Sequence, residues 1–194
     1  MLDENENVFY TVTTVSYDEK PGIQGIGTTA PDLPPQPGKH SAVSRDHEYV
    51  RYGTLSLLAG IDLMTGEVIG SVEERHRSQE SVAFLKKLDE HYPKEWKIQM
   101  VLDNHSAHTS KETQAYLETV PNRFAFAFSP KHASWLNVIE SFFAKMTKSM
   151  LRHIRVSSKE ELRQRIELYL QEVNRSPVQF RWKYGIDSAA RQPS

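Results

Sequence analysis

The sequence predicts an α/β domain built on a mixed five-stranded sheet that is flanked by helices. Three strand-like segments come first, and a tight turn at Gly66 joins two of them as an antiparallel hairpin. Helical patterns then alternate with two more short apolar segments, which is the order that builds parallel βαβ units. The 194 residues, of which 38% are hydrophobic and 10% aromatic, suffice for the core of one domain. We therefore expect three antiparallel strands and two parallel ones.

The first strand is predicted over residues 8–18, where β-branched and aromatic side chains gather. The next stretch, residues 19–39, carries five of the ten prolines and four of the nine glycines. Because proline lacks the backbone donor that a helix or a central strand needs, we expect a long loop here. The prediction is a Pro/Gly-rich insertion over residues 21–51, directly after the first strand.

The rest of the chain alternates between strand and helix patterns. Thr109 with Glu112, and Ser158 with Glu161, have the spacing of capping boxes and predict two helix starts. Residues 123–129 are apolar on both faces, which is typical of a buried parallel strand. In chain order the remaining predictions are strands over 53–63 and 67–73, a helix over 78–92, a strand over 97–102, a helix to 117, the strand over 123–129, and helices over 133–153 and 158–174.

The composition excludes several classes of protein. There is no cysteine, so disulfides and cysteine-ligated zinc sites are excluded, which fits a reducing cytoplasm. No apolar run approaches the roughly 18 residues of a membrane span. The N-terminal segment is acidic, unlike a signal peptide. We expect a cytoplasmic protein that does not cross a membrane.

Charge is distributed unevenly along the chain. The formal net charge of −1 argues weakly against nucleic acid as a partner. Residues 141–185, however, hold ten lysines and arginines against four glutamates, whereas residues 1–30 hold five acidic residues against one lysine. The basic C-terminal third is either a phosphate-contacting face or an ordinary solvated helix surface, and both interpretations stay open at this point.

One carboxylate lies within the apolar segment "SPKHASWLNVIESFFAKMTK". Residues three and four apart share a face of a helix, so Glu140 shares one with Leu136 and Phe143. We therefore expect Glu140 to be buried. A buried ionised carboxylate is costly unless it is paired or binds a metal, so this position predicts a partner.

Two aspartates end strands that we expect to be neighbours. Asp18 closes the first strand and Asp103 the fourth, where ligand sites in open α/β sheets gather. The helix after the fifth strand can then lay Glu140 over both aspartates. Three converging carboxylates repel one another unless divalent cations lie between them, and oxygen ligands suit Mg²⁺ or Mn²⁺. Two such ions would clamp the attacking and leaving oxygens of a phosphoryl displacement.

Three segments resemble the catalytic blocks of a DDE transposase: "YDEK", "VLDNHSAHTS" and the segment around Glu140. The similarity is to bacterial insertion sequences of the mariner superfamily (the IS six-thirty group), and "NRSPVQFRW" near the C-terminus resembles the same group. Asp18, Asp103 and Glu140 match the catalytic triad of that family. The resemblance implies metal-dependent cleavage of DNA at transposon ends and transfer of the freed 3′-hydroxyls into target DNA, at TA dinucleotides.

The resemblance also implies a domain layout and partners. A ribonuclease-H-like domain is expected over residues 8–185, between tails over 1–7 and 186–194. In mariner relatives the insertion after the first strand is a clamp that contacts the partner subunit, and residues 21–51 occupy its place, so we expect a homodimer. Such transposases usually recognise terminal inverted repeats through helix-turn-helix modules upstream. Only a short segment precedes the first strand here, so we expect that module outside this chain and a nucleoid-associated location.

Further residues near these blocks are candidates for contacting DNA or for orienting the triad. Lys145, Lys148 and Arg152 follow one another three and four residues apart, and we expect them to share a helix face that contacts phosphates. Each candidate also has a structural interpretation, as a loop, helix-start or solvated residue. The candidates are Asn104, His108, Lys131, Asn137, Lys145, Lys148 and Arg152.

Two other functions compete with transposition. One is another ribonuclease-H-like nuclease, such as a resolvase or a nuclease for RNA–DNA hybrids, which the sequence around Glu140 disfavours. The other is a truncated transposase product that binds a full-length or N-terminal partner and regulates it without catalysis. An assay on RNA–DNA hybrids tests the first, and co-purification with a helix-turn-helix polypeptide tests the second.

Overall fold

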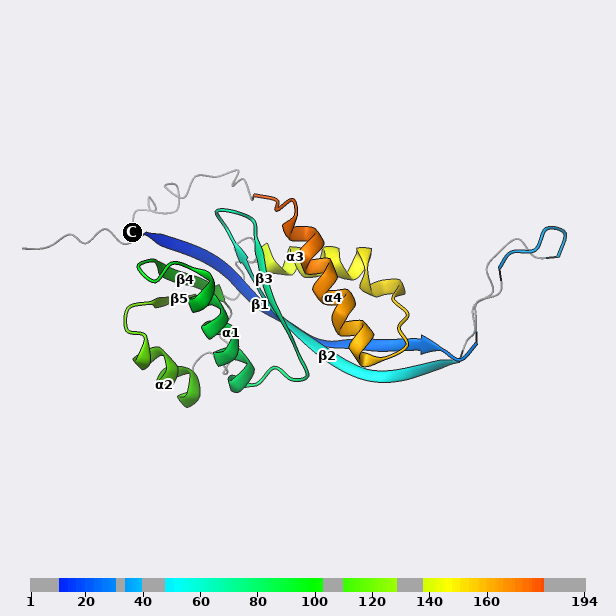
Figure 1. Cartoon of the computed structure of the whole chain (residues 1–194), viewed down its shortest axis with the longest axis horizontal. Helices are drawn as coiled ribbons and strands as arrows, with labels where there is room; N and C mark the ends of the chain where they lie inside the picture. The colour runs from blue at the N-terminus through cyan, green and yellow to red at the C-terminus, as the bar shows by residue number, and fades with distance from the viewer. Residues whose placement is uncertain (1–10, 31–33, 40–47, 103–109, 129–137, 180–194) are drawn as a thin grey trace, which may run out of the picture.

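A five-stranded sheet forms the centre of the molecule, with the strand order β3-β2-β1-β4-β5 (Figure 1). The computed structural model describes residues 11–30, 34–39, 48–102, 110–128 and 138–179. The elements are β1 (Val12–Thr28), β2 (Tyr49–Asp62), β3 (Val68–Glu73), α1 (Ser78–His91), β4 (Lys97–Leu102), α2 (Lys111–Thr119), β5 (Phe124–Phe128), α3 (Val138–Ser149), the 3₁₀ turn η3 (Leu151–His153) and α4 (Lys159–Asn174).

The strand directions confirm the predicted mixed sheet. β1 pairs with β2 in antiparallel fashion, and so does β2 with β3. β1 also pairs in parallel with β4, and β4 with β5. The first and fourth strands are therefore neighbours, as the sequence predicts. The hairpin between β2 and β3 turns at Gly66, whose φ of +79° is rarely adopted by residues that carry a side chain.

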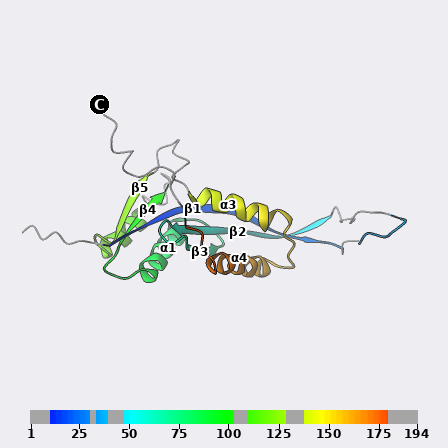
Figure 2. The same ribbon diagram turned by 90° about the horizontal axis from the view of Figure 1, so that it is seen from above.

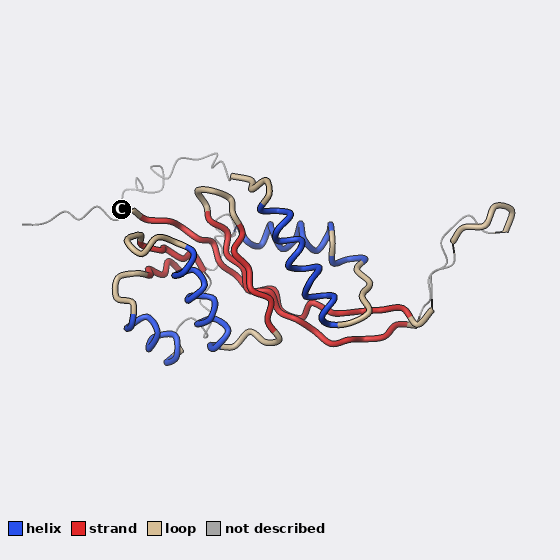
Figure 3. The backbone as a smooth tube through the Cα atoms, viewed as in Figure 1, coloured by secondary structure: helices blue, strands red, loops and turns tan. Residues whose placement is uncertain are grey.

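β1 is longer than the sequence predicts. It runs past Asp18 to Thr28 and stays paired with β2, so the loop prediction is wrong for residues 19–28 and 49–51. The two strands form a ribbon that continues beyond the helices, as the strand tubes in Figure 3 show. The segment that connects them is therefore residues 29–48.

A β-bulge explains how this strand accommodates proline. The ladder shifts register between Lys20 and Ile23, and Gly22 has a φ of +68°. β4 pairs with β1 only as far as Ser16, so Pro21 lies where its missing N–H removes no hydrogen bond to β4. Proline thus excludes a regular central strand, but it is compatible with a bulge beyond the end of the neighbouring strand.

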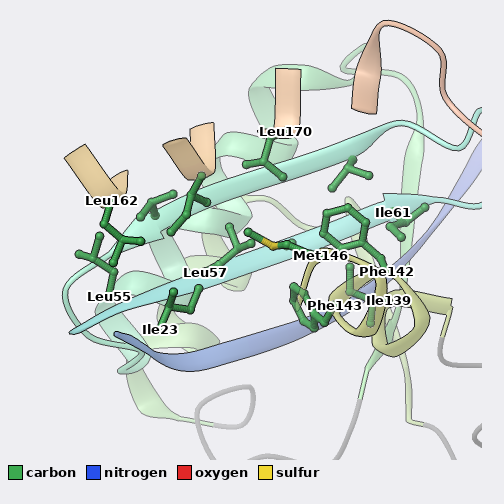
Figure 4. Close-up of a cluster of buried hydrophobic side chains, with 14 of the residues drawn as sticks. Ile23, Leu55, Leu57, Ile61, Ile139, Phe142, Phe143, Met146, Leu162 and Leu170 are labelled. Atoms are coloured by element: carbon green, nitrogen blue, oxygen red, sulfur yellow. The ribbon is translucent and has the colours of Figure 1, made fainter. Parts of the chain in front are cut away.

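Two hydrophobic cores lie on the two faces of the sheet. On one face, α3 and α4 pack on β2, and Figure 4 shows Phe142 and Leu162 among the side chains of this core. On the other face, Phe84 and Leu88 of α1 pack on β1 and β4. Figure 2 shows these elements from above, with the β1–β2 ribbon extending past α3 and α4. A sheet with parallel strands needs such cover on both faces.

The predicted end of α3 and the predicted burial of β5 are both wrong. α3 ends at Ser149 instead of His153, because Met150 departs from helical dihedral angles (φ −124°, ψ −54°) and a 3₁₀ turn follows. β5 is parallel to β4 as predicted, but most of its residues are half-buried and Phe128 is 45% exposed. The physical reason is that β5 is the outermost strand of the described sheet, so it has one strand neighbour instead of two.

Hydroxyl side chains cap both α2 and α4, as predicted, but only the α4 cap is at the predicted residue. Ser158 caps α4 by accepting a hydrogen bond from the Glu161 N–H, as its spacing predicts. α2 is capped by Ser110, which accepts from the Thr113 N–H, and the predicted cap Thr109 lies outside the described residues. Among the helices that the structure describes, none combines the length and apolar character needed to cross a membrane.

Candidate active site

Asp18 lies in β1 on the face of the sheet that α3 and α4 cover. Residues paired across an antiparallel ladder point to the same face; Asp18 pairs with Ala59, and Lys20 pairs with Leu57. Ala59 and Leu57 belong to the core beneath α3 and α4. The side chains of Asp18 and Lys20 therefore point toward those helices.

Glu140 lies in the first turn of α3 and is exposed, so the prediction that it is buried is wrong. The buried stripe of this helix runs through Ile139, Phe143 and Met146, and Glu140 lies beside the stripe instead of within it. A solvated carboxylate in a first turn is favoured by the helix dipole. Burial therefore provides no reason for a metal partner, and the case for one depends on what Glu140 faces.

A cation–π contact joins the strand that carries Asp18 to the helix that carries Glu140. The Lys20 ammonium lies 5.9 Å from the centre of the Phe143 ring. Lys20 follows Asp18 by two residues on the same strand face, and Phe143 follows Glu140 by three residues on the same side of the helix. α3 packs directly on β1, so the helix that carries Glu140 lies against the strand that carries Asp18.

The backbone orients the Asp18 carboxylate, whose Oδ1 accepts a 2.7 Å hydrogen bond from the Glu19 N–H. Glu19 points to the opposite face, since it pairs with Leu58 of the core under α1. There it accepts a 3.0 Å hydrogen bond from the Tyr17 hydroxyl. Burial, followed by the nearby Glu19 charge, raises the pKa of Tyr17 well above its usual value, so the phenol stays a donor. Asp18 is thus the acid that this part of β1 presents to α3.

The third predicted carboxylate belongs to the segment that follows β4. Pairing of Ser16 with Val101 brings the described end of β4 beside β1, two residues before Asp18. Within the residues that the structure describes, no group of three histidine, aspartate or glutamate side chains is arranged to hold a metal ion. The triad therefore stays a prediction. Outside the described residues lie the candidates Asp103, Asn104, His108, Lys131 and Asn137.

Residues 14–163 match the profile of a known protein family. That family is the DDE superfamily endonuclease, and the match includes the positions of Asp18, Asp103 and Glu140. The chain belongs to this superfamily. The predicted membership of a DDE family is thereby confirmed, and the predicted site lies within the matched region of the DDE endonuclease.

This DDE endonuclease is similar in sequence to an insertion-element protein and in fold to mariner transposase structures. An uncharacterized 39 kDa protein of insertion element IS630 from Shigella sonnei is 26% identical over 96 residues, which cover 50% of this chain and 28% of that protein. The Mos1 mariner transposase catalytic domain has a TM-score of 0.53 at 15% identity, over 81% of this chain and 69% of that one. The Mos1 paired end complex with Mn has a TM-score of 0.55 at 17% identity, over 82% of this chain and 48% of that one.

These comparisons confirm the predicted ribonuclease-H-like fold through the shared architecture of the Mos1 catalytic domain. An intasome of simian T-cell lymphotropic virus, at 11% identity, shares that architecture with a TM-score of 0.54, over 95% of this chain and 56% of that one. The DDE endonuclease chain spans just over a quarter of the insertion-element protein, 28%, and about half of the Mos1 chain in the paired end complex, 48%.

The DDE endonuclease leaves its predicted phosphate-contacting residues exposed. Lys145 and Lys148 lie on α3, and Arg152 lies on η3. None of the three has a carboxylate partner among the described residues. The prediction that all three share one helix face is wrong for Arg152, because α3 ends at Ser149 before reaching it.

Sequence reasoning missed Lys20 as a residue of this site. It is half-buried, lies on the same face as Asp18 and contacts the Phe143 ring. The alternation of a strand, with its period of two, would have placed Lys20 beside Asp18. The signal was hidden because Pro21 led to a loop prediction that began at residue 19.

Proposed function

We propose that this chain is the catalytic domain of a transposase that cuts DNA at transposon ends and joins the freed ends to target DNA. The observation that carries the proposal is that α3, which carries Glu140, packs on β1, which carries Asp18, in a DDE superfamily endonuclease. Similarity to an insertion-element protein and to the Mos1 fold supports it. We extend the proposal to terminal inverted repeats as the cut ends and to TA dinucleotides as the target.

Asp18, Asp103 and Glu140 would hold divalent cations in this proposal. Carboxylates supply only oxygen ligands and the chain has no cysteine, which fits two Mg²⁺ or Mn²⁺ ions better than zinc. When bound, such ions supply charge neutralisation and activate the attacking hydroxyl in a phosphoryl displacement. The chain itself supplies orientation: the Glu19 N–H holds one oxygen of Asp18, and the Tyr17 hydroxyl holds the Glu19 carboxylate on the other face.

DNA would approach along α3 in this proposal. The exposed cations Lys145, Lys148 and Arg152 follow Glu140 along the chain, and phosphate contacts from them would make binding weaken as salt rises. The same role, or orientation of the triad, is proposed for residues outside the described part. These are Asn104, His108, Lys131 and Asn137.

The β1–β2 ribbon and residues 29–48 would form a clamp that contacts a second copy of the chain. Tyr49 on this ribbon is 53% exposed, with the Arg51 guanidinium 5.2 Å from its ring centre. Exposed aromatic and arginine side chains are enriched in protein interfaces, so they suit a homodimer contact. Recognition of the terminal repeats would come from a helix-turn-helix segment elsewhere, and the complex would be cytoplasmic and nucleoid-associated.

The test is the substitution Glu140→Gln, which keeps the size of the side chain and removes its charge. We expect the variant to lose nicking of supercoiled plasmid in Mg²⁺ or Mn²⁺ while its thermal melting matches that of the parent chain. Glu172→Gln, at an exposed position of α4, is the matched control and should nick like the parent.

Nicking by Glu140→Gln at the parent's rate would exclude Glu140 from the site. A parent chain that folds and binds DNA, but nicks it in neither cation, would favour the regulatory hypothesis instead.

A further inference from the structure

We infer that a basic pocket next to the candidate active site binds a phosphate of the DNA backbone and positions the strand to be cut. The inference rests on the proposed function, because it takes DNA as the ligand. We name this cavity the β1–η3 pocket. It has a volume of about 210 Å³, and its lining includes Lys20, Arg152 and Arg155.

The bulge in β1 and the segment after α3 frame the β1–η3 pocket. Pro21 and Gly22 line its strand side, and nothing lies within 4 Å of the place that a Cβ would take at Gly22. On the far side, the Val156 N–H donates a 2.9 Å hydrogen bond to the Ile26 carbonyl, which ties the segment after η3 to the open edge of β1. The backbone, in addition to the side chains, therefore shapes the cavity.

None of the described residues that line this pocket is a carboxylate that could offset its positive charge. Among the described residues that line it, three are cationic and none is acidic. Lys20 contacts the Phe143 ring, and Arg155 donates a 3.0 Å hydrogen bond to the Ile154 carbonyl. Arg152 has no ion-pair partner within the described part of the chain. Like charges around one cavity repel one another, and a bound anion removes this repulsion.

The chemistry of the lining selects phosphate among anions. A guanidinium group presents a planar fork of donors that matches two oxygens of a phosphate, and a lysine adds a compact charge. Two arginines and one lysine around a small open cavity suit a phosphodiester in an extended polymer. A DNA strand supplies such groups in series, so one of them can enter the pocket while a neighbour lies at the site.

The position of the pocket makes it a positioning element. Lys20 follows Asp18 by two residues on one strand, which separates their Cα atoms by about 7 Å. A phosphate in the β1–η3 pocket would therefore lie close to the one at Asp18 on the same DNA strand. Lys20, Arg152 and Arg155 thus position DNA and take no part in the chemical step.

The experiment measures duplex DNA binding by the 194-residue chain through fluorescence anisotropy, at several salt concentrations and in EDTA so that no cleavage occurs. The double variant Lys20→Gln/Arg155→Gln should bind more weakly, with a plot of log K against log salt that is less steep by about 0.9, since the pocket holds one phosphate and each neutralised phosphate contributes about 0.9. The control Lys86→Gln/Lys111→Gln removes the same charge from exposed positions of α1 and α2 and should keep the parent's slope.

A second pair of variants tests the pocket without deleting a cation. Gln24 is exposed and lines the pocket, so Gln24→Glu places a carboxylate there and should weaken DNA binding. Gln114→Glu makes the same change at an exposed position of α2 and should have the smaller effect. Thermal melting of each variant checks the fold.

Equal salt slopes for the pocket variant and the control variant would overturn the inference, and so would equal effects of the two glutamate substitutions. Plasmid nicking by the parent chain is recorded separately. A parent that nicks DNA while the pocket variant keeps the parent's slope refutes the pocket alone. The remaining case is a parent chain that does not nick DNA, together with a pocket variant whose salt dependence is less steep than the parent's. This result refutes the proposed function and supports a DNA-binding pocket.

Discussion

α3 and α4 pack on the same face of the sheet, and the centroids of their Phe142 and Tyr169 rings are 6.1 Å apart. The positive charges of the two helices nevertheless have different surroundings. The cations of α4 form ion pairs. These are Lys159–Glu74, Arg163–Glu160 and Arg165–Glu161, with N–O distances of 2.7, 3.9 and 2.5 Å. On α3 and η3, by contrast, Lys145, Lys148 and Arg152 have no carboxylate partner among the described residues.

This difference shows that a count of basic residues does not locate a phosphate-binding face. Residues 141–185 appear in the sequence as one basic block. The fold divides the block, because the start of α4 lies within reach of Glu74 and α3 does not pair with any described acid. Surface ion pairs add only about 0–1 kcal/mol each to stability. Their effect on function is larger, since a paired cation is less available to an external phosphate.

The largest expected effect tests the core that both helices share. Leu162 of α4 is fully buried, and Leu162→Ala should lower the free energy of unfolding by about 2–5 kcal/mol through the lost contacts and the cavity left behind. Leu168 on the same helix is 49% exposed, and the same truncation there should cost less than about 0.5 kcal/mol. Urea unfolding followed by circular dichroism measures both. Equal losses would contradict the packing on which the comparison of α3 and α4 depends.

A matched pair of arginine truncations tests the comparison itself. Arg163 of α4 donates a hydrogen bond to the Val72 carbonyl of β3, so Arg163→Ala should lower the free energy of unfolding by about 1–2 kcal/mol. Arg152→Ala should change it by less than about 0.5 kcal/mol, because this side chain is exposed and has no ion-pair partner within the described part.

DNA affinity should show the opposite order for these two variants. Arg152→Ala should weaken duplex binding and reduce its salt dependence, whereas Arg163→Ala should bind like the parent chain. Urea unfolding and fluorescence anisotropy together measure the pair. The comparison would be refuted if the α4 variant lost affinity and the η3 variant kept it.

The smallest expected effect is a pH dependence that belongs to the start of α4. Hydrogen bonds from the Ser157 side chain and backbone, and then from Arg165, lower the pKa of Glu161 to about 2. The unfolded chain should have a value of about 4.3 at this position. Because the folded pKa is the lower one, the stabilisation is complete above the unfolded value and is lost as the pH falls through the folded value.

Glu161→Gln should therefore flatten the dependence of Tm on pH between about pH 5 and pH 2. Glu172→Gln, at an exposed position near the other end of the same helix, serves as the control and should keep the parent's dependence. Thermal melting across this pH range measures both variants. A Glu161→Gln curve parallel to that of the parent would show that the carboxylate does not stabilise the start of α4.

Local patterns in the sequence predicted most of the elements correctly. The turn at Gly66 and the cap at Ser158 were found because each depends on residues only a few positions away. The continuation of β1 past Pro21 was missed because it depends on a distant fact, namely that β4 pairs no further than Ser16. The neighbouring positions of β1 and β4 were predicted because strand order follows from the alternation of strands and helices.

The sequence by itself determined the order and type of the elements and the superfamily of the chain, because alternation, caps and motif blocks are properties of nearby residues. Only the tertiary structure decided that Glu140 lies beside the buried stripe of α3, and which basic side chains are paired. These outcomes depend on how elements pack against one another. Lys159 and Glu74, for example, are far apart in the chain and meet only in the folded protein.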